Sequence, residues 1–186
     1  MKYTIGKHEL FRIQESLKEA KGSLQKNDLY EAYDIFLSKV YYKYYHIRYM
    51  TMYLYNLGID PIDYLTDTLP AGCFYDVPIS PRLLEGNGLT FNNTSIKVLQ
   101  PYCICGQHNI EVIDLSNIIE VVDQAILDCK NLRVAIFDNA KAPTLPVFED
   151  LFVDCPNIEE IVVYNSENLC KSLRILQASG LDFTMK

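Results

Sequence analysis

The chain of 186 residues is long enough for one domain with an appended helical unit, and its 49% hydrophobic and 22% charged residues are typical of a protein with an apolar core. No run reaches the roughly 18 uncharged apolar residues of a membrane-spanning helix, and the first residues lack a basic-then-apolar secretion signal. We therefore expect a cytoplasmic protein with no membrane partner, in which the six cysteines are reduced thiols.

The net charge of −7 is distributed unevenly along the chain. Residues 1–60 carry nine Lys/Arg and seven Asp/Glu, whereas residues 61–186 carry eight and seventeen. Ten of the fourteen tyrosines also lie in residues 1–60. Glycine and proline punctuate the chain at Gly58-Ile59-Asp60-Pro61. We therefore predict two units, residues 1–60 and residues 61–186.

The first unit is predicted to be an antiparallel helical hairpin. Residues 7–26 place an apolar residue at alternating steps of three and four, which forms one stripe on a helix. The members of this stripe are Leu10, Ile13, Leu17, Ala20 and Leu24. A turn at Asn27-Asp28 leads into a second helix over residues 29–57, and Gly58 is a typical C-terminal stop.

The second helix is apolar on several faces from Val40 onward, mostly because of its tyrosines. One hairpin partner cannot cover all of these faces, so we expect the hairpin to cap the N-terminal end of the second unit. A different interpretation is an anion-binding site at Lys39, Lys43 and Arg48, since basic residues among tyrosines can hold phosphates and stack bases. The first unit has little net basic charge, which argues against a nucleic-acid partner.

The second unit contains an internal repeat in which Cys, any residue, and Asn or Ser precede an aliphatic residue. The copies are Cys129-Lys130-Asn131-Leu132, Cys155-Pro156-Asn157-Ile158 and Cys170-Lys171-Ser172-Leu173, with a variant copy from Asn109 to Leu115 after Cys105. The repeats beginning at Asn109, Asn131 and Asn157 are spaced by 22 and 26 residues. A period in the twenties with one short strand per unit predicts a solenoid.

Stacked repeats should bury three continuous columns of apolar side chains. The columns are Ile110, Leu132, Ile158 and Leu173; Ile113, Ala135, Ile161 and Leu176; and Leu115, Phe137, Val163 and Ala178. The first repeat is predicted to start near Leu69, with a turn at Gly86-Asn87-Gly88 and a strand at Leu89-Thr90-Phe91. Its middle, residues 78–88, is irregular.

Residues 69–178 resemble the BspA-type leucine-rich repeats. The clearest instance runs from Ile119 to Leu132, where an apolar-x-x-apolar pattern leads into Asp-Cys and then Asn-Leu. The resemblance implies a curved solenoid used for protein–protein contact, with no common catalytic residues. The predicted fold class is therefore α+β: a leucine-rich-repeat array of about five turns, with short parallel strands on its concave face and the helical hairpin as its cap.

No motif in the chain points to catalysis, a cofactor or a metal. Cys103-x-Cys105 with His108 lacks the second ligand pair of a zinc site. Neither a nucleophile motif nor a phosphate-binding glycine loop is present around the three histidines or Gly86-x-Gly88. We therefore predict that the protein is not an enzyme.

The outward positions of the predicted strands suggest a protein-binding face. These positions are Val112, Asp114, Val134, Ile136, Glu160, Val162, Ile175 and Gln177. Five of the eight are aliphatic, with an acidic rim at Glu111, Asp138, Glu159 and Glu160. This strip also has two simpler interpretations: parallel strands favour β-branched residues whatever they bind, and the hairpin could fold over the strip.

The predicted function is protein binding through the concave face, to a partner with a basic or mixed apolar and basic surface. One alternative is an acidic inhibitor or regulator of a nucleic-acid-handling protein. Another is an assembly subunit, for example of a virion, that self-associates through the tyrosine-rich helix. The size and composition are compatible with a phage or other viral origin.

Overall fold

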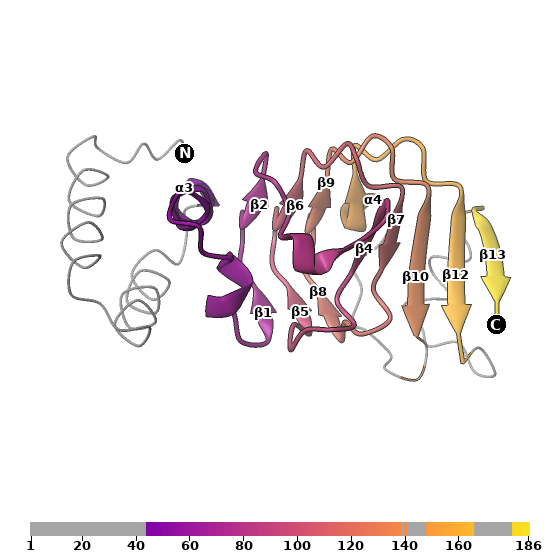
Figure 1. Ribbon diagram of the computed structural model, residues 1–186. Helices are drawn as coiled ribbons and strands as arrows, with labels where there is room; N and C mark the ends of the chain where they lie inside the picture. The colour runs from indigo at the N-terminus through magenta and orange to yellow at the C-terminus, as the bar shows by residue number, and fades with distance from the viewer. Residues whose placement is uncertain (1–43, 139, 141–147, 166–179) are drawn as a thin grey trace.

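The computed structural model describes residues 44–138, 140, 148–165 and 180–186, and they form a solenoid of parallel strands (Figure 1). Most of the predicted helical hairpin, residues 1–43, lies outside the described residues. The solenoid has three sides, each a sheet whose strands come from successive turns of the chain.

Sheet A contains β1 (Thr68–Leu69), β5 (Val98–Leu99) and β8 (Glu120–Val121). Sheet B contains β2 (Phe74–Tyr75), β6 (Ile104–Cys105), β9 (Ile126–Leu127) and β11 (Phe152–Val153). Sheet C is the longest, with β3 (Leu84–Glu85), β4 (Gly88–Thr90), β7 (Val112–Asp114), β10 (Val134–Asp138), β12 (Glu160–Tyr164) and β13 (Asp182–Met185). All pairs are parallel except the β3–β4 hairpin, whose turn lies at the predicted Gly86-Asn87-Gly88.

The predicted parallel solenoid is confirmed, but several details of the prediction are wrong. Each full turn has three strands instead of one, and the described residues form three complete turns followed by β11, β12 and β13 rather than five turns. The described solenoid residues contain little helix: the 3₁₀ turns Pro61–Tyr64 and Pro81–Leu83 and the four-residue α4 (Phe148–Leu151). Each strand of sheets A and B has two residues. This is too few for an alternating pattern of apolar and polar residues to reveal the strand in the sequence.

Sharp corners flank the strands of sheet B. After β2, β6, β9 and β11 the chain passes through Asp76, Gly106, Asp128 and Asp154, all with positive φ between 48° and 69°. Before the first three of these strands it passes through Gly72, Tyr102 and Gln124, which also have positive φ. Aspartate tolerates this left-handed conformation better than most residues, which explains why Asp recurs one residue before Cys in the repeat.

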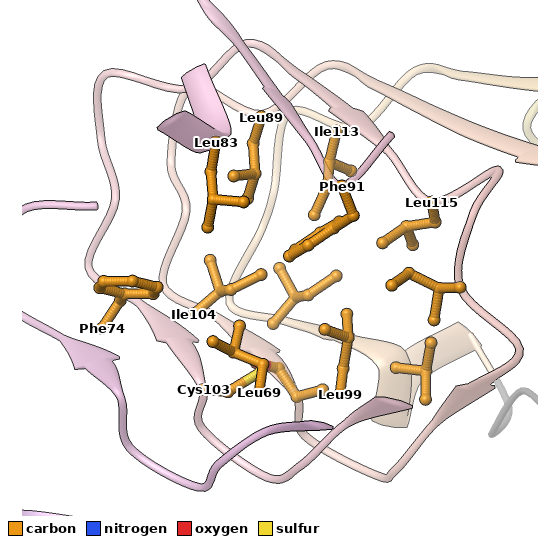
Figure 2. Close-up of a cluster of buried hydrophobic side chains, with 14 of the residues drawn as sticks. Leu69, Phe74, Leu83, Leu89, Phe91, Leu99, Cys103, Ile104, Ile113 and Leu115 are labelled. Atoms are coloured by element: carbon orange, nitrogen blue, oxygen red, sulfur yellow. The ribbon is translucent and has the colours of Figure 1, made fainter. Parts of the chain in front are cut away.

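The three predicted columns fill the interior of the solenoid. Their members from residues 110 to 163 are all buried, and Leu69, Leu89 and Leu99 extend the core to the first turns. Figure 2 shows the side chains of sheets A, B and C converging on this interior, with Phe74, Phe91 and Ile104 among them. The described repeat cysteines, Cys105, Cys129 and Cys155, are buried as well.

The described part of the second predicted helix, α3 (Tyr44–Asn56), packs against the first turn at β2 (Figure 1). Ile47, Met50 and Leu54 are buried in the same core as the solenoid. The hydroxyl of Thr51 lies 3.6 Å from the thiol of Cys73, so the contact is continuous across the boundary between the two predicted units. The helix ends at Asn56, and Gly58, whose φ is +72°, lies in the turn that follows, as expected of the predicted C-terminal stop.

Candidate interaction surface on sheet C

The outer face of sheet C aligns the candidate binding residues in two rows. The first row runs from Val112 through Val134 to Glu160, and the second from Asp114 through Ile136 to Val162. Parallel pairing sets both rows, since residues 22 or 26 apart lie side by side. Six of the eight predicted residues are thus brought together on one face.

The last pair of predicted residues, Ile175 and Gln177, lies outside the described residues. The strand that pairs with β12 is β13, so Asp182 lies beside Glu160 and Thr184 beside Val162. The position beside β12 that the prediction assigns to Ile175 and Gln177 is therefore occupied by β13. The Thr184 hydroxyl donates a hydrogen bond to the Glu160 carboxylate, which joins the two strands by their side chains.

The aliphatic residues of these rows differ in exposure. Val112, Val134 and Ile136 are half-buried, but Val162 is only 6% exposed and contributes mainly to packing. Tyr164, the next outward residue on β12, is 40% exposed and was not among the predicted site residues. Its outward position follows from the two-residue alternation after Glu160 and Val162, so the sequence pattern contained this signal.

The charge on the strands of sheet C is negative. β7, β10, β12 and β13 carry Asp114, Asp138, Glu160 and Asp182 and contain no Lys or Arg. Among the described residues, none of these four carboxylates forms an ion pair. Amides bind two of them instead: Asn92 donates to Asp114 at 2.8 Å, and Asn165 donates to Asp138 at 2.7 Å.

A polar depression lies where the chain enters these strands, lined by Glu111, Asn131, Arg133, Asn157 and Glu159. The Arg133 guanidinium donates to the Glu159 carboxylate, at 2.6 Å from Nε. The two asparagines bridge successive turns, because Asn131 donates to the carbonyl of His108 and Asn157 to that of Lys130. The Asn of the repeat motif therefore has a structural role.

Of the candidate anion-binding residues Lys39, Lys43 and Arg48, Arg48 lies within the described residues. Lys39 and Lys43 lie outside the described residues. Arg48 lies on α3, with its guanidinium carbon 5.8 Å from the centre of the Tyr75 ring and its Nε buried without a hydrogen-bond partner among the described residues. Arg48 therefore contributes to the packing of α3 against the first turn.

Cys103 and His108, two members of the Cys103-x-Cys105 and His108 group in the sequence, lie in different environments in the structure. Cys103 is fully buried in the core, whereas His108 is exposed and lies near Asp128. The described residues contain no group of three His, Cys, Asp or Glu side chains that could hold a metal ion.

Burial raises the pKa of the Cys73 and Cys105 thiols to about 12. A hydrogen bond from Cys129 lowers the pKa of Cys155.

Comparisons with family models, with curated protein sequences and with solved structures gave no match to the chain. In the described part of the chain, no helix is long and apolar enough to cross a bilayer.

Proposed function

We propose that the chain is a non-enzymatic protein-binding module that binds its partner on the outer face of sheet C. The observation that carries this proposal is a strip of Val112, Val134 and Ile136 flanked by carboxylates that form no ion pair within the described part of the chain. Apolar contact would supply affinity and the carboxylates would select a basic surface. We also propose, from the repeat motif and its asparagine bridges, that the solenoid is a divergent BspA-type leucine-rich repeat.

The test is affinity capture with the full chain as bait, in wild-type form and as Val134→Glu/Ile136→Glu. Both residues are half-buried on the outer face, so the change alters the surface more than the core. Val162 is left unchanged because its side chain is almost fully buried. Circular dichroism should show that the variant keeps its fold.

The matched control is Ile119→Glu, which makes the same kind of change at an aliphatic side chain that is 46% exposed beside sheet A. We expect a partner retained by the wild type and by the control to be lost by the double variant. A partner retained equally by all three baits would refute the proposed face.

A second candidate function is an acidic inhibitor of a nucleic-acid-handling protein. The excess of seventeen acidic over eight basic residues in residues 61–186 favours it, since carboxylates could occupy a phosphate-binding surface. In that case the carboxylates, and not the aliphatic strip, would dominate binding. Self-association as an assembly subunit is a further proposal, and a monomer whose mass by light scattering is independent of concentration would argue against it.

A further inference from the structure

The face of sheet C offers a partner side chains and no backbone groups. β7 pairs with β4 and β10, β10 with β7 and β12, and β12 with β10 and β13. The backbone N–H and C=O groups of these strands are thereby used within the sheet. A segment that docks on this face must satisfy its own backbone hydrogen bonds, because leaving them unpaired and buried is costly. An α-helix meets this requirement, whereas a single extended strand does not.

The apolar residues of this face follow a diagonal across the strands: Val112, Val134 and Ile136 are half-buried, Val162 is almost fully buried and Tyr164 is exposed. The path steps from Val112 on β7 to Val134 on β10, then along β10 to Ile136, and across to β12 at Val162 and Tyr164. With strands about 4.8 Å apart and about 6.7 Å between outward residues, Val112 and Val162 are roughly 12 Å apart. Two turns of an α-helix cover about 11 Å, so the strip accommodates one apolar residue per helical turn.

Carboxylates lie on both sides of this diagonal. Asp114 and Asp138 lie on one side, next to Val112 and Ile136 along their strands. Glu160 and Asp182 lie on the other side, beside Val134 and across β12. A helix with basic residues on both flanks of its apolar stripe would place its cations near these carboxylates.

We infer that the partner element is an amphipathic α-helix with Lys or Arg on both flanks of its apolar stripe, lying diagonally across β7, β10 and β12. This inference rests on the proposed function and specifies its partner. It commits to a helix, so a second sheet or an extended peptide on the same face would contradict it.

The test uses synthetic peptides and the full chain. One peptide carries leucines spaced by three and four residues with lysines on both flanks, and a second has the same composition but a proline at its centre, which breaks the helix. A third alternates leucine and lysine, as in a strand. Fluorescence anisotropy measures the affinity of each for the wild type, Val134→Glu/Ile136→Glu, Glu160→Gln/Asp182→Asn and the Ile119→Glu control.

We expect the helical peptide to bind the wild type and the Ile119→Glu control at least tenfold more tightly than either other peptide. The double-Glu variant should lose roughly tenfold or more of this affinity, and the neutralised variant a smaller factor. Equal binding of the proline peptide, tighter binding of the alternating peptide, or no binding of the helical peptide at about 1 mM would overturn the inference. The proposed function fails separately, if capture of the natural partner does not depend on Val134 and Ile136.

Discussion

At the scale of single residues, the corners of sheet B show how one dihedral angle limits the sequence. Gly106 has a φ of +69°, and a Cβ placed on it would collide with Oδ1 of Asp76 in the turn before. The equivalent corner one turn later carries Asp128 with a φ of 52°. The same backbone conformation therefore leaves room for a side chain at Asp128 and leaves no room for a Cβ at Gly106.

We predict that Gly106→Ala lowers the free energy of unfolding by about 1–3 kcal/mol, since it combines a left-handed alanine with a close contact. Asp128→Gly is the control: glycine adopts this conformation freely, and the exposed contacts with Lys130 and His108 that are lost contribute little. Urea unfolding followed by circular dichroism measures both. Equal stability of Gly106→Ala and the wild type would show that the corner adapts without strain.

The buried thiols give a second prediction at this scale. The thiolate is the reactive form, so thiols with a pKa of about 12, Cys73 and Cys105, stay protonated and slow to react at pH 8. Cys155, whose pKa is lowered by the hydrogen bond from Cys129, should be alkylated before them. Raising the pH from about 8 to about 10 should accelerate Cys73 and Cys105 more than Cys155.

Site-resolved mass spectrometry after brief iodoacetamide treatment measures this order. The denatured chain, in which all thiols are exposed, is the control and should label without preference. Labelling of Cys73 or Cys105 ahead of Cys155 in the folded protein would contradict the prediction.

The sequence predicted well which residues of the repeats are buried. The column containing Ile113, Ala135 and Ile161 followed from periodicity, because these positions are apolar in every repeat and alternate with the outward positions along each strand. The recurrent Asp before Cys was seen in the sequence, but its left-handed conformation was not predicted. The spacing of a repeated motif shows that a position is constrained, but it does not show the dihedral angles of the residue at that position.

At the scale of elements, α3 covers the apolar end of the first turn, as a solenoid requires. Leu54 is only 2% exposed in this contact. We predict that Leu54→Ala lowers the free energy of unfolding by about 2–5 kcal/mol, through lost burial and the cavity left behind.

Met52→Ala is the matched control on the same helix, because Met52 is 41% exposed. Its effect should stay within about 0.5 kcal/mol. Urea unfolding of both variants tests the cap: similar small effects for Leu54→Ala and Met52→Ala would mean that α3 contributes little to the stability of the solenoid.

Elements were predicted less well than residues. Pairing between distant strands decides the last repeat, where Asp182 and not the predicted Ile175 lies beside Glu160. The four-residue motif at Cys170 resembles the earlier copies, but a motif this short does not determine which strand completes the hydrogen bonds of β12. The candidate site was accordingly predicted on β7, β10 and β12 and missed Thr184 and Tyr164.

At the scale of the whole molecule, the balance of apolar and charged contacts determines how binding responds to salt. If the aliphatic strip dominates, the affinity for the partner should fall only a few-fold between about 0.05 and 0.5 M salt, because screening weakens only the charge contribution. A complex led by the carboxylates should weaken far more steeply.

Titration of the captured partner by calorimetry at several ionic strengths separates the two cases. The Ile119→Glu variant serves as the control, since it adds a charge away from sheet C. A steep loss of affinity with salt would favour the acidic inhibitor over the apolar docking face.

The turns around β5–β7 and β8–β10 share one period on all three sides. Val98 pairs with Glu120, Ile104 with Ile126 and Val112 with Val134, and each pair is 22 residues apart. A tandem duplication of residues 98–119 would therefore insert a whole turn with every sheet in register. The same duplication would lengthen the outer face of sheet C by one strand. Gene-length change in steps of 22 codons could thus enlarge the binding surface without a new fold.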